Sequence, residues 1–393
     1  MILPGAGARG AYQVGVLKAV ARLLPRHARN PFSVIAGTSA GAINAAVLAS
    51  RASNFNVAVG EMERVWANFE AEQVYRTDNW TMVKSSLHWL TALVFGGLGV
   101  RNPAYLLDNS PLRGLLERNI NFDHIQRAVD RGYLDALAVT ASAYTSARSV
   151  TFFQGAERLR PWARVRRIGR SEQIGVEHLM ASAAVPFVFS PVKIGNEYYG
   201  DGAMRQRAPL SPAVHLGADR MLVIGVRDEH PDQEPTDEAA GEMPTLAHLA
   251  GYMLDTLFMD GLYADLERIS RINAIIEQVP KEALTGNVSR LRVLDTLIVV
   301  PKEDLRSVAE RHVRELPRAV RLLLGGLGAM NKGGRQLISY LLFESGYTQE
   351  LIDMGFQDAM EVEEDLRAFL FDQPTDTLDA RFDIKRDLLW EIP

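Results

Sequence analysis

The chain has 393 residues, a net charge of −5 and 47% apolar residues, which is typical of a soluble globular protein with one large domain or two. A general nucleic-acid binder would usually be basic, and a chain without cysteine has no disulfide, no Cys-ligated metal and no thiol nucleophile. The longest apolar stretch, residues 87–100, is too short to span a bilayer, and the N-terminus lacks the features of a signal peptide. We therefore expect a cytoplasmic or peripheral membrane protein.

The first fifty residues have the pattern of two successive strand–turn–helix units. The predicted elements are a strand ending at Ile2–Leu3, a turn over 4–10, a helix over 11–24, a strand over 32–36, a turn over 37–41 and a helix over 42–50. Such units form parallel strands, so we expect an α/β fold with a central, mainly parallel sheet and helices on both faces. Only about two strand residues precede the first turn, fewer than a strand usually has, which suggests that this strand is trimmed.

Further strands, and then a long helical region, are predicted downstream. The strands are expected at Leu137–Tyr144, Val150–Phe153, Met221–Val226 and Leu297–Val300, with a hairpin over Val192–Tyr199 that turns at Gly195-Asn196. Ser110 should cap a helix that has Pro111 in its first turn. Residues 228–242 are acidic and polar, as in a surface loop, and the pattern is mostly helical from Thr245 to Phe371. We expect a sheet domain over residues 1–301 and a helical region over 302–393.

Basic residues are concentrated in two parts of this acidic chain. The first sixty residues contain six Lys and Arg and no Asp or Glu. The second group is Arg158, Arg160, Arg164, Arg166, Arg167 and Arg170. A basic face on an acidic protein favours an anionic ligand or an anionic membrane surface, although an ordinary solvated surface would show the same pattern.

Gly37-Thr38-Ser39-Ala40-Gly41 has the form G-x-S-x-G, the pattern of a nucleophile on a sharp strand-to-helix turn. The flanking glycines, Gly37 and Gly41, leave room for a strained backbone and for the substrate. The helix that follows would point its N-terminal amides at the site. The pattern alone is weak evidence, because a Gly-rich turn with an idle serine would match it. Its position between an apolar strand and an Ala-rich helix favours Ser39 as a nucleophile.

A second Gly-rich turn, Gly5-Ala6-Gly7-Ala8-Arg9-Gly10, matches G-x-G-x-x-G and has two interpretations. A dinucleotide-binding loop would need an acidic residue about 20 positions later, but no carboxylate precedes Glu61. Alternatively, the backbone N–H groups of Gly5 to Gly10 form an oxyanion hole beside Ser39, since neighbouring parallel strands bring their turns to the same sheet edge. We favour the second interpretation, in which Arg9 adds positive charge near the oxyanion or holds the loop.

Asp201-Gly202-Ala203 follows the predicted hairpin, and an aspartate at a strand end could be the base that activates a serine. A turn-forming or helix-capping role is the ordinary alternative for an Asp-Gly pair. Asp260-Gly261 is a rival, but it lies in a helical pattern. A Ser-Asp-His triad would need one of His215, His230, His248 or His312, and none of them lies in a Gly-flanked loop after a strand. The histidines show no metal-ligand spacing.

The three motifs, in this order, resemble the patatin-like phospholipase family, which has a Gly-rich loop, a G-x-S-x-G elbow and a D-G-G/A motif. The run from Ala181 to Phe187 also resembles the stretch that precedes the hairpin in this family. Ala6 departs from the family pattern, which has a glycine there. The resemblance covers about the first 230 residues.

This resemblance implies a serine lipid acyl hydrolase of phospholipase A or lysophospholipase type. It would use a Ser39–Asp201 dyad without histidine, and neither a metal nor another cofactor. The substrate would be a phospholipid or another acyl lipid. A soluble carboxylesterase, a thioesterase, or a lipid- or partner-binding module with little turnover are the alternatives. The aromatic and apolar segment Trp80–Leu107 could be a lid or interfacial segment, or simply a core helix and loop.

Overall fold

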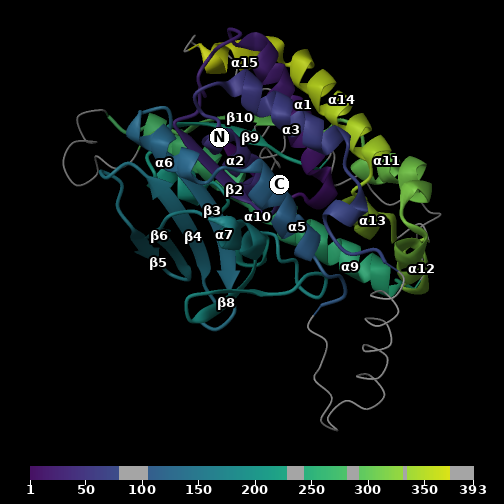
Figure 1. The fold of residues 1–393 in the computed structure, drawn as a ribbon. Coiled ribbons are helices and arrows are strands. Elements are labelled where there is room, and N and C mark those ends of the chain that lie inside the picture. The colour runs from purple at the N-terminus through teal and green to yellow at the C-terminus, as the bar shows by residue number, and fades with distance from the viewer. Residues whose placement is uncertain (79–104, 228–242, 281–291, 331–333, 372–393) are drawn as a thin grey trace, which may run out of the picture.

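The computed structural model describes residues 1–78, 105–227, 243–280, 292–330 and 334–371, and the described residues form one ten-stranded sheet (Figure 1). In spatial order the main strands are β10 (Asp295–Val299), β9 (Arg220–Ile224), β1 (Ile2–Leu3), β2 (Val34–Thr38), β3 (Ala136–Ala143), β4 (Ser149–Gly155), β6 (Arg167–Ser171) and β5 (Trp162–Arg164). A hairpin of β7 (Val192–Ile194) and β8 (Glu197–Asp201) is joined to β3 through β8.

The sheet has a parallel side and a mixed side. The five neighbouring strands from β10 to β3 are parallel. β3 pairs antiparallel with β4 on its far edge and with β8 beyond the end of β2, whereas β4 and β6 are parallel. The expected central, mainly parallel sheet is thus confirmed. Its parallel half brings the ends of β1 and β2 to one edge, and this edge carries both Gly-rich turns.

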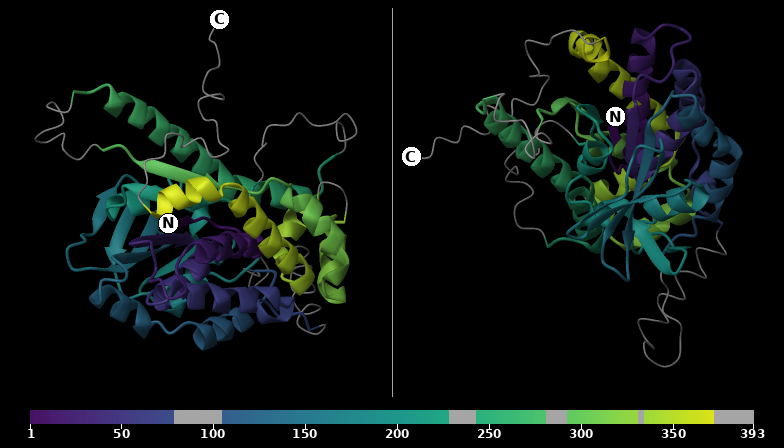
Figure 2. Two further views of the ribbon diagram at one scale, coloured as in Figure 1. Left: turned by 90° about the horizontal axis from the view of Figure 1, so that it is seen from above. Right: turned by 90° about the vertical axis from the view of Figure 1, so that its left-hand side faces the viewer.

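Helices cover both faces of the sheet (Figure 2). The connections after β1 and β2 supply α1 (Gly10–Leu23), α2 (Ala40–Ser50), α3 (Phe55–Ala67), α5 (Ser110–Asn119) and α6 (Asp123–Asp130). The later segments supply α7 (Val176–Ser182), α8 (Ser211–His215), α9 (Leu246–Asp255) and α10 (Gly261–Glu277). The strands β1, β2 and β3 follow one another toward one edge of the sheet, whereas β9 and β10 follow one another toward the opposite edge. Because crossovers are right-handed, α10 and α3 lie on opposite faces.

The last part of the chain folds back onto its beginning. It contains α11 (Leu305–His312), α12 (Arg318–Gly326), α13 (Arg335–Leu341), α14 (Ser345–Glu361) and α15 (Glu363–Leu370). Helix α14 runs beside α1 (Figure 1). Their backbones approach so closely that a Cβ on Gly15 would lie 2.0 Å from the Ile352 carbonyl oxygen. Helices before and after residue 301 therefore share one apolar core, and the domain boundary there stays a prediction.

Most of the expected elements are found within a few residues of their predicted ends. The hairpin turn is confirmed, with Gly195 at a φ of +60°. One detail is wrong: Asn109, not Ser110, is the N-cap of α5, because the helix begins at Ser110 itself. The predictions for residues 228–242, for most of Trp80–Leu107 and for His230 lie outside the described residues. No described helix is both long and apolar enough to cross a membrane.

Candidate active site

Ser39 occupies a strained turn between β2 and α2. Its φ of 55° and ψ of −129° are sparsely populated by residues other than glycine, and such strain is concentrated at functional sites. A Cβ on Gly41 would lie 2.1 Å from the Leu3 carbonyl oxygen, so the turn is pressed against the end of β1 and requires glycine there. A side chain at Gly37 would collide in the same way with the backbone of Gly41. Ser39 thus has the geometry of a nucleophile elbow.

Ser182, at the end of α7, holds this turn in place. Its hydroxyl accepts the Ser39 backbone N–H at 2.8 Å and donates to the Thr140 carbonyl at 2.7 Å. The Ser39 N–H therefore points into the protein and not toward a substrate. In the sequence, Ser182 stands out only as part of the run from Ala181 to Phe187. Its contact with Ser39, 143 positions away in the chain, follows from the packing of α7 against β3.

Asp201 reaches Ser39 through the pairing of three strands. In the sheet, Thr38 pairs with Thr140 and Ala141 pairs with Asp201. Because β4 occupies the other edge of β3, β8 follows β2 along the same edge, and the ends of these two strands meet there. Gly202 allows the end of β8 to pack closely against the end of β2, since a Cβ at this position would lie 2.8 Å from Cγ2 of Thr38. The Asp201 side chain is only 2% exposed. The rival Asp260 is exposed and forms an ion pair with Arg227 at 3.6 Å.

The two carboxylate oxygens of Asp201 have different surroundings. Oδ1 accepts the Ala203 backbone N–H at 2.9 Å, which fixes the carboxyl group. Oδ2 is buried and has no partner at hydrogen-bonding geometry among the described residues. Burial raises the pKa of Asp201 to about 7, and the nearby Ser39 hydroxyl and the Ala203 N–H act in the opposite direction. Ser39 is therefore close enough to influence the carboxyl group, although it falls short of a regular hydrogen bond.

The turn from Gly5 to Gly10 lies beside Ser39. A Cβ on Gly5 would be 3.3 Å from Cβ of Ser39, and Gly7 lines a cavity together with Ser39. Gly7 has a φ of +52°, and a Cβ there would lie 2.5 Å from the Tyr340 carbonyl oxygen. The N–H groups of Arg9 and Gly10 already donate to carbonyls within the turn. This leaves the earlier residues of the loop, Gly5 to Ala8, as the ones that could donate to a substrate.

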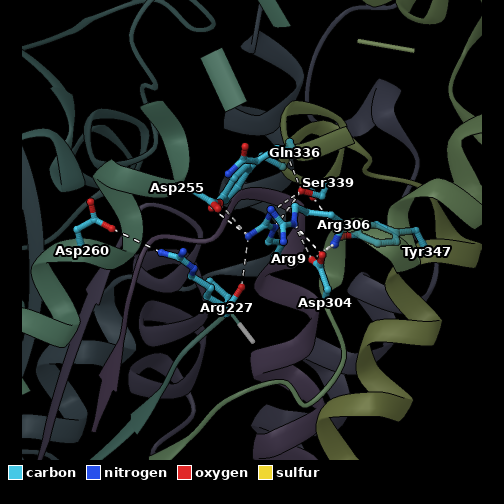
Figure 3. A network of polar contacts seen from close by, with 11 residues as sticks. Arg9, Arg227, Asp255, Asp260, Asp304, Arg306, Gln336, Ser339 and Tyr347 are labelled. Atoms are coloured by element: carbon cyan, nitrogen blue, oxygen red, sulfur yellow. Dashed lines mark hydrogen bonds and ion pairs between the residues drawn. The ribbon is translucent and has the colours of Figure 1, made fainter. Parts of the chain in front are cut away.

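Arg9 is not among the residues that line the cavity, and its side chain lies in a buried polar network (Figure 3). Its guanidinium donates to Ser339 Oγ at 2.7 Å and to the Tyr340 hydroxyl at 3.1 Å, and it pairs with Asp255 at 3.2 Å. It also lies 3.9 Å from the centre of the Tyr340 ring. Although burial acts in the opposite direction, Arg9 and a hydrogen bond from Tyr340 hold the pKa of Asp255 below its ordinary value. Of the two roles considered for Arg9, this geometry favours holding the loop.

A largely apolar cavity of about 290 Å³ opens at Ser39. Its walls come from α2, α3 and α5 and from residues downstream of β9: Leu254, Phe258, Tyr340, Leu341 and Phe343. No local pattern in the C-terminal region points to a role in the site. The fold nevertheless places α13 and the segment after it in the wall of the cavity that opens at Ser39.

The described histidines lie elsewhere. His215 stacks on Trp162, His312 pairs with Glu315 and Glu350, and none of the described residues that line the cavity is a histidine. His178 is buried but accepts the Gly175 N–H within its own helix. In the described part of the chain, no cluster of three or more His, Asp or Glu side chains could hold a metal ion.

A family model described as patatin-like phospholipase matches residues 1–214, more than half of the chain. The matched range contains Ser39, Asp201 and both Gly-rich turns. None of the curated proteins matches the chain. Among solved structures, the crystal structure of VipD from Legionella pneumophila is similar at 12% identity, over 99% of this chain and 89% of that one. The TM-score of this match is 0.28, which is too low to carry an argument.

Proposed function

Since the chain belongs to the patatin-like phospholipase family, and is in general terms a lipid acyl hydrolase, we propose that Ser39 and Asp201 form a catalytic dyad that cleaves acyl esters of phospholipids or lysophospholipids. One observation carries the proposal: a strained serine lies beside a buried aspartate whose Oδ2 lacks a regular partner, at the end of an apolar cavity. Such a cavity suits an acyl chain, and the dyad suits the ester bond at its head.

In the proposed reaction, the Ser39 hydroxyl attacks the ester carbonyl carbon while its proton passes to Oδ2 of Asp201. Loop N–H groups from Gly5 to Ala8, with Gly7 nearest the cavity, stabilise the oxyanion of the tetrahedral intermediate. When the intermediate collapses, the leaving alkoxide takes the proton back from Asp201 and departs as the lysolipid or alcohol. Water then attacks the acyl-enzyme with Asp201 again as base, and the fatty acid is released.

The nucleophile assignment predicts that a fluorophosphonate probe labels Ser39 and no other serine. Ser39→Ala should abolish the labelling and leave the fold intact, because the change removes no core volume. Intact-mass and peptide mass spectrometry would locate the label. Ser53→Ala is the matched control, since it removes a hydroxyl from an exposed serine that does not line the cavity and leaves the proposed nucleophile in place. Labelling that persists in Ser39→Ala would reject the assignment.

The substrate class is tested by measuring hydrolysis of phospholipid vesicles, lysophospholipid and a short soluble ester side by side, with mass spectrometry of the products. The proposal expects release of fatty acid from the lipids at the higher kcat/KM. Turnover of the soluble ester alone would indicate a carboxylesterase or thioesterase. Probe labelling and lipid binding without turnover would indicate a binding module.

We also propose that the arginine-rich hairpin contacts anionic membranes. Arg164 and Arg167 flank its turn, where Arg166 has a φ of +60° and Val165 is 89% exposed. Replacing Arg160, Arg164, Arg166 and Arg167 by Gln should weaken binding to phosphatidylserine vesicles by about 1 kcal/mol for each charge that lies near the surface. Binding of the unmodified protein should also weaken with salt. Neutral phosphatidylcholine vesicles are the control, and binding that is indifferent to both changes would reject the contact.

A further inference from the structure

The cavity at Ser39 follows one face of α2 from end to end. Ser39, Ile43, Val47 and Arg51 all line it, and their spacing of four residues places them on one side of the helix. At 1.5 Å per residue, the distance along the axis from Ser39 to Arg51 is about 18 Å. Helices α3 and α5 form the facing walls, with Met62, Val65, Leu112 and Leu116 among the lining residues.

The lining changes from apolar to charged along this path. Asn44 is the polar residue near Ser39, but its amide is already engaged: Nδ2 donates to Gln13 at 3.0 Å and Oδ1 accepts the Trp66 indole N–H at 2.9 Å. At the far end, by contrast, Arg51 and Glu61 form an ion pair at 2.9 Å. Burial of methylene groups is favourable along the apolar part of the cavity and contributes little beside the half-buried charges at its far end.

We propose that α2 acts as a molecular ruler, which means that its length sets the longest acyl chain that the cavity accepts. The chain begins at Ser39, and the longest accepted chain ends at the Arg51–Glu61 pair. This inference rests on the proposed function and extends it to the length of the substrate. An extended chain of single bonds advances about 1.2 Å per bond, which follows from about 3.6 Å for the three bonds of an extended residue. The path of about 18 Å thus accepts about 15 bonds, the length of a long-chain fatty acyl group.

The opposite orientation would place a lipid head group beside Arg51, and the distance between Ser39 and Arg51 is incompatible with it. In a phospholipid the phosphate is only a few bonds from the ester carbonyl that Ser39 would attack. The Arg51–Glu61 pair lies about 15 bonds away along the cavity. The far end therefore receives the terminal methyl of the acyl chain, and the head group lies on the other side of Ser39.

Bulky residues along the same face of α2 provide a graded test. Ile43 lies about 6 Å beyond Ser39 and Val47 about 12 Å, which correspond to about 5 and 10 bonds. Ile43→Trp should therefore limit the enzyme to acyl groups of about 5 carbons and Val47→Trp to about 10. Within each variant, kcat/KM for esters above the limit should be at least tenfold lower than for esters below it, a drop that the unmodified enzyme should not show at these lengths. Val57→Trp is the matched control, because Val57 is exposed on α3 and does not line the cavity.

Hydrolysis of esters with 4 to 18 acyl carbons gives one readout, and binding gives another that is independent of turnover. In the Ser39→Ala background, calorimetry with free fatty acids below their micellar concentrations should show affinity rising about fourfold per methylene. The rise should end near 15 carbons, and earlier in the two Trp variants. Replacing both Arg51 and Glu61 by Leu should move the limit to longer chains.

The outcomes separate this inference from the proposed function. A binding limit that moves with the Trp position, without hydrolysis of any ester, would support the ruler and overturn the proposed function. Hydrolysis with the same length profile in Ile43→Trp, Val47→Trp and Val57→Trp would overturn the ruler and leave the proposed function standing. Thermal unfolding of each variant confirms that the altered profiles belong to folded protein.

Discussion

Asp201→Asn is expected to lower kcat by about 10²- to 10⁴-fold, the range that a general base contributes. The substitution keeps the shape of the side chain and the acceptor for the Ala203 N–H, but it removes the oxygen that would take the Ser39 proton. Steady-state kinetics on a lysophospholipid would measure the loss. Substrate binding should be retained, since Asp201 is buried beside Ser39 and does not form the acyl cavity wall.

The pH dependence of the unmodified enzyme should report the same carboxyl group. Burial raises the pKa of Asp201 to about 7, and the base must be ionised to accept a proton. We therefore expect kcat/KM to rise with pH through about 7 and to level off above it. An aspartate with an ordinary pKa would instead be fully active from about pH 5 upward.

The stability of Asp201→Asn should change in the direction opposite to its activity. The pKa of Asp201 is higher in the folded state than in the unfolded state, so the folded protein loses stability as pH rises from about 4 to 7. Asparagine carries no charge to bury, and at pH 8 the variant should be more stable by up to about 4 kcal/mol. Chemical unfolding would measure the free energy of unfolding of the variant and of the unmodified protein. The difference between the two should be large at pH 8 and small at pH 4.5.

Histidine substitutions provide the control for the dyad. Replacing His215, His248 or His312 singly by Ala should leave most of the activity, and the same holds for His230, which the structure does not describe. If one of these variants stays folded and loses activity as completely as Ser39→Ala, the enzyme is a triad hydrolase and Asp201 has another role.

Arg9→Ala is expected to destabilise the protein by about 3–5 kcal/mol, because it leaves Asp255 as a buried charge without its partner. The change also removes the hydrogen bonds to Ser339 and Tyr340, which join the Gly-rich loop to α13. We expect kcat to fall as well, since the loop that bears the proposed oxyanion donors loses its support. Urea unfolding would measure the loss in the free energy of unfolding, provided that the m-value of the variant equals that of the unmodified protein.

Arg26→Ala is the matched control for Arg9, because Arg26 is exposed on the surface and should contribute within about 0.5 kcal/mol. The double variant Arg9→Met/Asp255→Asn should recover part of the lost stability, since neither buried group is then charged. Equal stabilities of Arg9→Ala and Arg26→Ala would contradict the structural role of Arg9. Gly7→Pro would be a poor test of the loop, because proline cannot adopt the φ of +52° at that position.

The sequence by itself was sufficient for the parallel core of the fold and for the placement of the two Gly-rich turns. These features are local: apolar periodicity marks the elements, and glycine marks the backbone positions that a side chain would block. Gly37 and Gly41 illustrate this, because each meets neighbouring backbone in the structure. The family resemblance rests on the same short motifs, and the match over residues 1–214 agrees with it.

Only the tertiary structure decided what surrounds these motifs. Arg9 and Ser339 are 330 positions apart, so no local pattern could show that the loop is tied to α13. The contact of Ser182 with Ser39 and the contributions of Phe258 and Phe343 to the cavity have the same origin. The raised pKa of Asp201 follows from burial by segments distant in the chain. Desolvation and cavity shape are sums over such contacts, and they exist only once the chain has folded.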